Sequence, residues 1–205
     1  RSTGKIGVCM MVPGPGLLNA GAGLATAYSA SSPVLAICGQ IASDLIGKER
    51  GALHEIKNQL DMVGSITKWA ARPMSASDVP GAVREAFVHL TSGRPRPVEV
   101  EIPPDVLMTG REVLLSEPGV EPRLSGDPDL LERAAQALGQ AKNPVFFAGG
   151  GVVSADAGRE LQELAEMLEA PVVLSPTSKG AISSRHHLSH TGIASYQLLP
   201  KADVI

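Results

Sequence analysis

The sequence predicts the α/β class, with two doubly wound parallel-sheet domains in succession. Three observations lead to this class. Short apolar runs alternate with segments of helical period along the chain. A turn rich in glycine and proline, at residues 12–16, separates the first apolar run from the first helical segment. An order of helix, strand, helix and strand then returns after residue 126.

The N-terminal domain begins with a strand, a helix and a second strand. Residues 6–12 are apolar without interruption, which predicts a strand buried on both faces of its sheet. A helix is expected over residues 16–31, and residues 33–38 give the second strand. Because little chain separates the two strands, we expect them to lie parallel and to be joined by a right-handed crossover.

The turn before the first helix is the main candidate binding site. This turn contains Gly14, Pro15 and Gly16, and the helix start directs its bare backbone N–H groups and positive dipole end into it, where a phosphate or a polar heterocycle can bind. Gly21 and Gly23 each cost about 1 kcal/mol of helix propensity relative to alanine, which indicates that something approaches this helix closely. Close packing of the helix on its sheet explains the two glycines equally well.

A second group of candidates follows the second strand, in the irregular segment 39–61. Open parallel sheets bind ligands at the carboxyl ends of their strands. Four side chains of this segment are therefore expected to line a site: Gln40, His54, Glu55 and Gln59. For residues 48–50 a solvated loop is the favoured interpretation.

The rest of this domain is predicted to be a short strand, a helix and a last strand. Residues 65–72 give the short strand, and Asp78 caps the helix. The core-facing stripe of this helix consists of Val83, Ala86, Phe87 and Leu90. In residues 98–102, valine and isoleucine alternate with Glu99 and Glu101, which predicts a strand with one exposed face.

A linker and a second domain complete the chain. Residues 107–126, rich in glutamate, proline and glycine, are interpreted as an interdomain linker. Asp127 caps the next helix. Strands are expected at residues 144–148 and 171–174, with a helix at 156–169 between them. The apolar stripes of the two helices are Leu131, Ala134, Ala135 and Leu138 on the first, and Leu161, Leu164, Ala165 and Leu168 on the second.

Composition excludes several classes of function. The 205 residues carry a net charge of −3 without a basic run, which argues against a nucleic-acid partner. No apolar stretch reaches about 18 residues, so no membrane span is expected. Cys9 and Cys38 lie in strand-like runs and are interpreted as buried thiols of a reducing, cytoplasmic compartment. Residues 1–4 are interpreted as the end of a helix and residues 202–205 as the start of a strand. We therefore expect this sequence to be a piece of a longer chain.

Three further polar features have plain explanations. His186, His187 and His190 match no zinc framework, and a loop with histidines is the favoured interpretation; no metal ligands are expected. The glycines at 149–151 precede a helix, as in phosphate sites, but lack the G-x-G-x-x-G spacing, which favours a vestigial nucleotide fold. Lys68 either reaches the site or solvates the end of a strand.

Several segments, in this order and spacing, resemble the acetolactate-synthase-like family of thiamine-diphosphate enzymes. The resemblance covers nearly the whole chain. Residues 1–106 resemble most of the pyrimidine-binding (PYR) domain, and residues 127–205 part of the central domain. The segments include Gly14-Pro15-Gly16-Leu17-Leu18-Asn19, Gly39-Gln40, Ser65-Ile66-Thr67-Lys68, Ser92-Gly93-Arg94-Pro95 and Ile102-Pro103-Pro104-Asp105-Val106.

The resemblance implies a cofactor, a reaction and a partner. Such enzymes use thiamine diphosphate with magnesium to decarboxylate a 2-keto acid and to join the carbanion to a second carbonyl. They work as homodimers or homotetramers. The activating glutamate is expected before Arg1 and the magnesium site in a domain that this sequence lacks, so the chain alone is expected to be inactive. The positions implied beside the pyrimidine ring or the substrate channel are Gly14, Pro15, Gly16, Asn19 and Gln40.

The sequence departs from the family pattern in two places. Acetolactate synthases carry Phe-Gln-Glu at the substrate entrance, where this chain has Leu53-His54-Glu55. His54 is either a proton donor facing the substrate or a residue of the loop only. The central domain of acetolactate synthases holds FAD, but residues 185–192 depart from the flavin-contacting pattern, which favours loss of FAD. A 2-keto-acid decarboxylase, a 2-hydroxyacyl lyase and a non-catalytic nucleotide-binding module are the alternative functions.

Overall fold

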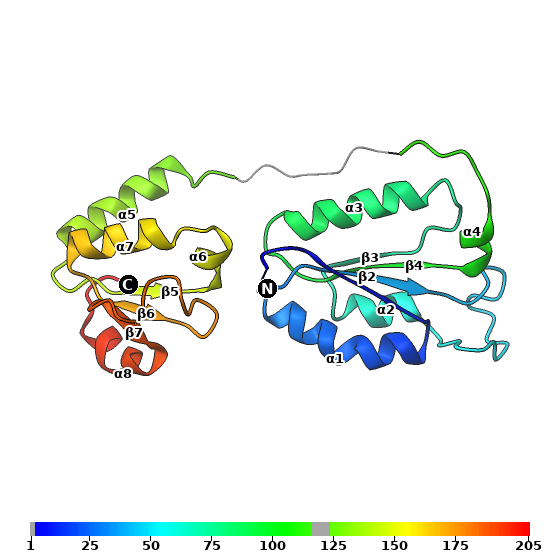
Figure 1. Cartoon of the computed structure of the whole chain (residues 1–205), viewed down its shortest axis with the longest axis horizontal. Coiled ribbons are helices and arrows are strands. Elements are labelled where there is room, and N and C mark those ends of the chain that lie inside the picture. Colours follow the sequence, from blue (N-terminus) through cyan, green and yellow to red (C-terminus); the bar gives the residue numbers. More distant parts are fainter. Residues whose placement is uncertain (1–2, 116–123) are drawn as a thin grey trace. The chain divides into compact units, whose positions relative to one another are not determined.

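A computed structural model describes residues 3–115 and 124–205 of the chain (Figure 1). The chain divides into two compact units, Arg1–Arg123 and Leu124–Ile205. Residues 116–123, which belong to the predicted linker at 107–126, lie outside the described residues, as do residues 1–2. Both units are α/β and both sheets are parallel throughout, which confirms the predicted class.

Unit 1 is a four-stranded sheet with helices on both faces. Its strands are β1 (Gly7–Met11), β2 (Val34–Gly39), β3 (Trp69–Ala71) and β4 (Val98–Ile102), in the order β1-β2-β4-β3. Helices α1 (Pro15–Ser29) and α2 (Gln59–Gly64) cover one face, and α3 (Val79–Thr91) covers the other (Figure 1). The parallel pairing of β1 with β2 confirms the predicted crossover. Helix α2 was not expected, and it begins within segment 39–61, which was predicted to be irregular.

Strand β1 is not buried on both faces, and this expectation was wrong. Cys9 and Met11 pack towards α1, but the side chains of Val8 and Met10 are 60% and 79% exposed. The reason is the position of β1 at the edge of the sheet, because α3 packs mainly against β2, β3 and β4. An apolar run therefore indicated the strand but not the number of its covered faces.

Strand β4 corrects a second expectation, since both of its faces are buried. It lies between β2 and β3, and Val98, Val100 and Ile102 pack into the core beneath α3. Glu99 and Glu101, predicted to face solvent, have no exposed surface and lie on the face that α1 and α2 cover. A central strand of a doubly wound sheet has no solvent face, whatever its polar alternation.

Lys68 stabilises the end of α3. Its Nζ donates hydrogen bonds to the carbonyl oxygens of His89 (2.7 Å), Ser92 (2.6 Å) and Arg94 (3.3 Å). These carbonyls lie at and just beyond the C-terminus of the helix, where a cation is favourable. Partial burial, and then the positive charge of Arg96, lower the pKa of Lys68.

Unit 2 is a three-stranded sheet in the order β5-β6-β7. Its strands are β5 (Phe146–Ala148), β6 (Val172–Leu174) and β7 (Ser189–Thr191). The helices are α5 (Pro128–Gln140), α6 (Gly150–Ser154), α7 (Gly158–Leu168) and α8 (Ser195–Leu198), with short 3-10 turns at Gly192–Ala194 and Leu199–Lys201. Asp127 caps α5 as predicted, because its carboxylate accepts from the amides of Asp129 and Leu130. Near the C-terminus, Val204 forms a single parallel bridge with Pro144.

Several local expectations for the later elements need correction. His190 lies in β7, so the histidine segment is not only a loop. Leu164 of α7 is exposed, because it lies at the rim of the stripe that Leu161, Ala165 and Leu168 form. The apolar stripe of α5 exists in sequence, but none of its residues is buried. Helix α4 (Pro104–Met108) extends two residues into the segment predicted to be a linker.

None of the helices within residues 3–115 and 124–205 combines the length and the apolar character needed to cross a bilayer.

Candidate functional site

The candidate site lies in unit 1, where the carboxyl ends of its four strands meet. The turn at residues 13–16, called here the Gly14 turn, follows β1, and Gln40 follows β2. Arg72 follows β3, and Glu101 is the penultimate residue of β4. Because the strands are parallel, these four positions share one edge of the sheet, the edge at which open α/β sheets bind ligands.

Glu101 is the centre of a buried polar cluster. Its Oε2 accepts a hydrogen bond from Nε2 of Gln59 (2.7 Å), and its Oε1 accepts one from Nε2 of Gln40 (3.3 Å) and one from Nε of Arg72. Glu101 has no exposed surface and the side chain of Arg72 is only 19% exposed. A buried carboxylate is tolerated when it is paired and hydrogen-bonded, as here. Gln40, Gln59, Arg72 and Glu101 are called the Glu101 network below.

Gln59 connects this network to the Gly14 turn. Its Oε1 accepts a hydrogen bond from the backbone N–H of Gly14 (2.8 Å), and its Nε2 also donates to the carbonyl oxygen of Gly39 (3.0 Å). The Oε1 of Gln40 accepts from the N–H of Ile41 (2.7 Å). Gln59, at the start of α2, therefore holds the backbone that follows β1 and the last residue of β2.

The loop that carries His54 packs against the same turn. Gly14 has a φ of +57°, and a Cβ at this position would clash with the carbonyl oxygen of His54. His54 itself has a φ of +70°, which is uncommon for a residue with a side chain. Its neighbour Glu55 accepts a hydrogen bond from the amide of Ala52 and so stabilises the loop internally. Only glycine fits at position 14, because the backbone of the loop leaves no space for a side chain.

Glu99 lies two residues before Glu101 on the same face of β4 but has a different environment. Among the residues that the structure describes, neither of its carboxyl oxygens has a hydrogen-bond partner. Burial, and then the negative charge of Glu101, raise the pKa of Glu99 to about 9, against a smaller opposite effect of Arg72. Burial and both glutamates also raise the pKa of the neighbouring Cys38 to about 12. We conclude that the Glu99 carboxyl and the Cys38 thiol are neutral near pH 7.

The structure brings some of the sequence-predicted residues together. Gly14, Gln40, His54 and Gln59 meet around the turn, whereas Glu55 is occupied within its own loop. Pro15 and Asn19 lie on an exposed part of the first turns of α1, and Gly16 is half-buried beside Val12.

Sequence reasoning missed Arg72 and Glu101. The available signal was that two acidic side chains alternate on a strand of a parallel sheet, where they need buried partners.

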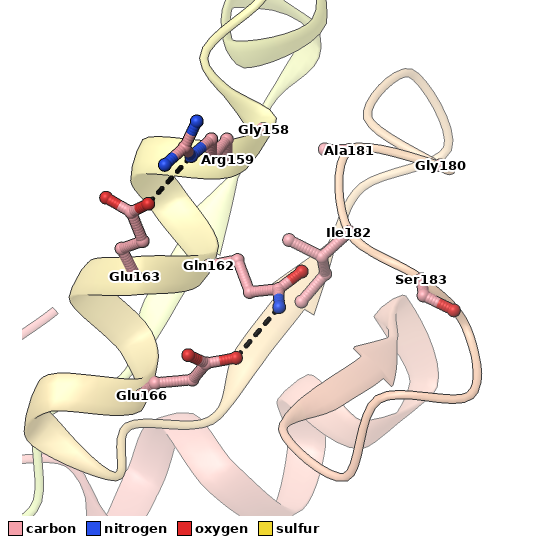
Figure 2. Close-up of a pocket in the computed structure, with 9 residues that line it drawn as sticks. All are labelled: Gly158, Arg159, Gln162, Glu163, Glu166, Gly180, Ala181, Ile182 and Ser183. Carbon is pink, nitrogen blue, oxygen red and sulfur yellow. Dashed lines mark hydrogen bonds and ion pairs between the residues drawn. The ribbon is translucent and has the colours of Figure 1, made fainter.

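A pocket of about 480 Å³ lies in unit 2, between α7 and residues 180–183 (Figure 2). On the helix side, Arg159 pairs with Glu163 (2.8 Å) and Glu166 accepts from Gln162 (2.8 Å). Glu166 also contacts Nε2 of His186 (2.9 Å). The lining thus carries two carboxylates against one guanidinium, a charge balance that does not suit a phosphate. Among the described residues, no group of three or more histidine, cysteine or acidic side chains could hold a metal ion.

Comparison with known families identifies both units. Residues 1–62 match the family described as "Thiamine pyrophosphate enzyme, N-terminal TPP binding domain". Residues 131–205 match "Thiamine pyrophosphate enzyme, central domain". Two parallel α/β units in this order, with a glycine turn at the carboxyl edge of the first sheet, agree with both matches. The chain belongs to the family of thiamine pyrophosphate enzymes.

Within this family the chain is similar to acetolactate synthases. It is 38% identical over 198 residues to the acetolactate synthase of Arthrospira platensis, and the alignment covers 92% of this chain and 33% of the relative. The identity is 36% over 196 residues, with the same coverage, to the "Probable acetolactate synthase large subunit" of Methanocaldococcus jannaschii. It is 35% over 195 residues to the acetolactate synthase isozyme 3 large subunit of Escherichia coli, covering 91% and 33%. The chain spans about a third of the length of these relatives.

Proposed function

We propose that this chain is part of a thiamine-diphosphate enzyme that decarboxylates a 2-keto acid and joins the resulting carbanion to a second carbonyl, as an acetolactate synthase does. The supporting observation is the Gly14 turn, which stands at the carboxyl edge of a unit matching the TPP-binding domain. The names of the relatives favour carboligation over simple decarboxylation or lyase activity.

The turn and the start of α1 fit the pyrimidine half of the cofactor in our proposal. Pro15 and Asn19 are four residues apart, so they share one face of α1, and both are exposed. The helix start offers backbone N–H groups at its end, apart from Pro15, which has none, and Gly14, whose N–H is bonded to Gln59. Gln40 is buried below, where it braces the turn through the Glu101 network. We therefore assign Gly14, Pro15, Gly16, Asn19 and Gln40 to the cofactor or the adjoining substrate channel.

The cofactor, when bound, supplies the electron sink that stabilises the carbanion. The residues of this chain bind and orient it, and His54 is proposed to donate a proton at the substrate entrance. We place the activating glutamate before Arg1 and the magnesium ligands in another domain of the full-length protein. The 205-residue chain alone is therefore proposed to be inactive.

Further parts of the proposal concern the assembly and the second unit. We propose a homodimer or homotetramer in the cytoplasm, as the resemblance implies. We also propose that unit 2 has lost FAD, because residues 185–192 depart from the flavin-contacting pattern and instead form β7 and the His186–Glu166 contact. Flavin absorbance in the purified full-length protein would contradict this part of the proposal.

The deciding experiment is an assay of the full-length protein with pyruvate, thiamine diphosphate and magnesium. Formation of acetolactate that depends on the cofactor supports the proposal. Carbon dioxide release with a free aldehyde as the main product would assign a decarboxylase, and turnover of no 2-keto acid would overturn the proposed function.

A further inference from the structure

We propose that Glu101 is a positioning residue: acting through Gln59, it fixes the backbone N–H of Gly14 and thereby the geometry of the turn that opens α1. This inference deepens the proposed function and depends on it, because the turn is assigned there to the cofactor.

The side chain of Gln59 links Gly14 to Glu101 through the two ends of its amide, and this linkage is called the relay below. It forms in only one orientation of the amide. Its oxygen accepts from the N–H of Gly14 (2.8 Å), and its nitrogen donates to Oε2 of Glu101 (2.7 Å). If the amide were turned over, its NH₂ group would face the N–H of Gly14 and its oxygen would face the carboxylate, which are two repulsive contacts. The shorter of the two bonds from this nitrogen goes to Glu101, and the other goes to the carbonyl oxygen of Gly39 (3.0 Å). These two acceptors fix the orientation of Gln59, and this orientation provides the acceptor for Gly14.

The relay is buried and braced, so solvent does not substitute for its members. Gln59 is 1% exposed and Glu101 is fully buried. Arg72 and Gln40 both donate to the other oxygen of Glu101, which connects the ends of β2 and β3 to the same carboxylate. If one of these side chains is removed, its partner becomes a buried polar group without a hydrogen bond. This costs more free energy than the loss of a hydrogen bond that water can replace.

Glu99 provides a control from the same strand. It lies on the same face of β4 as Glu101 and is equally buried, but among the described residues its carboxyl oxygens accept no hydrogen bond. A role that depends only on burial predicts similar effects at both positions. A relay predicts an effect of Glu101 on the cofactor and none of Glu99.

The test uses the full-length protein and four variants: Gln59→Met, Glu101→Gln, the double variant Gln59→Glu with Glu101→Gln, and Glu99→Gln. For each, the melting temperature without cofactor, kcat, and the concentration of thiamine diphosphate that gives half-maximal rate (its KM) are measured. We expect Gln59→Met and Glu101→Gln each to raise this KM about tenfold or more, the effect of one lost buried hydrogen bond. Glu99→Gln should leave it within about twofold of the parent.

The double variant distinguishes positioning from packing. It exchanges the amide and the carboxylate, so the side chain at 59 still accepts from Gly14 and now accepts from the amide at 101. We expect it to lower the KM for thiamine diphosphate relative to Glu101→Gln alone, because the side chain at 59 again has a donor at 101 and keeps its acceptor for Gly14, a coupling typical of residues in contact. The recovery should be partial, because the carbonyl oxygen of Gly39 loses its donor.

The outcomes separate this inference from the proposed function. If the parent depends on thiamine diphosphate but Gln59→Met changes only the melting temperature, the positioning role is wrong. If the parent shows no dependence on the cofactor, the proposed function fails. In that case hydrogen exchange at the Gly14 amide of the 205-residue chain decides the relay, and exchange unchanged by Gln59→Met would overturn it.

Discussion

Glu99 and Glu101 lie two residues apart on the same face of β4 and are both fully buried, but only Glu101 is paired with a basic side chain. One guanidinium, that of Arg72, thus neutralises one of two neighbouring acids, and the other acid keeps its proton at neutral pH. The two carboxyl groups of this small cluster therefore differ in their charge at neutral pH.

The first prediction concerns Glu99 and pH. The unfolded chain releases this proton near the ordinary pKa of 4.5, whereas the folded chain retains it up to about pH 9. Between these values the folded state binds more protons, so stability is lost as the pH rises. Glu99→Gln removes this loss. The quantity to compare is the free energy of unfolding of the variant minus that of the parent. From about pH 5 to about pH 8, this difference should rise by about 1 kcal/mol per pH unit.

Urea unfolding at several pH values measures this difference. The matched control is Glu85→Gln, because Glu85 is a half-exposed residue of α3. Its difference from the parent should stay small, because Glu85 makes only an exposed ion pair with Arg84. Parallel stability curves for Glu99→Gln and the parent would show that the Glu99 carboxyl is ionised in the folded state.

The second prediction concerns the Arg72–Glu101 pair. Arg72→Met leaves a buried carboxylate without its basic partner, and we expect a loss of about 3 kcal/mol in the free energy of unfolding. The fluorescence of Trp69, the only tryptophan of the chain, reports unfolding of this unit. The control is Arg84→Met, which breaks the exposed pair with Glu85 and should cost less than about 0.5 kcal/mol. Equal losses in the two variants would contradict the importance of burial.

The third prediction concerns the Gly14 turn. Gly14→Ala places a side chain at a φ of +57° and against the carbonyl oxygen of His54, so we expect a loss of about 2 kcal/mol or more. Gly23→Ala is the control, because that position in α1 opens to free space and should gain up to about 1 kcal/mol from helix propensity. Thermal melting of both variants gives the comparison. If Gly14→Ala leaves the melting temperature unchanged, the loop that carries His54 can move aside at little cost in free energy.

The fourth prediction concerns His54 in the full-length protein. His54→Ala keeps the backbone carbonyl beside Gly14 but removes the imidazole, and we expect kcat/KM for 2-keto acids to fall about 10²-fold, the low end for a positioned acid–base group. His54→Phe returns an aromatic ring without proton chemistry and should improve the use of pyruvate relative to the parent. His187→Ala, an exposed histidine of unit 2, is the control. If His54→Ala leaves kcat/KM within about twofold for every substrate tested, His54 is a loop residue only.

Much of the fold could be predicted from the sequence, because the signals that determine it are local. Apolar runs correctly predicted the strands β1, β2 and β5, and Asp127 caps α5 as expected. Burial was harder to predict, because it depends on the position of a strand in its sheet. The apolar β1 is partly open at an edge, whereas the acidic β4 is enclosed at the centre.

The candidate site shows the same limit. Gly14, Gln40 and Gln59 could be found because they follow strands or stand in loops beside them. Arg72 and Glu101 could not, since their pairing joins the ends of β3 and β4 across the sheet. No spacing in the sequence reports a contact between residues 29 positions apart.

The exposed face of β1 has a consequence for handling the 205-residue chain. On the side away from β2, β1 pairs with no other strand of the described residues, and Val8 and Met10 project from it into solvent. An unpaired strand edge with apolar side chains is a template onto which a strand of another molecule can add. A concentrated solution of this chain should therefore form aggregates whose growth stops when Val8 and Met10 are replaced by lysine.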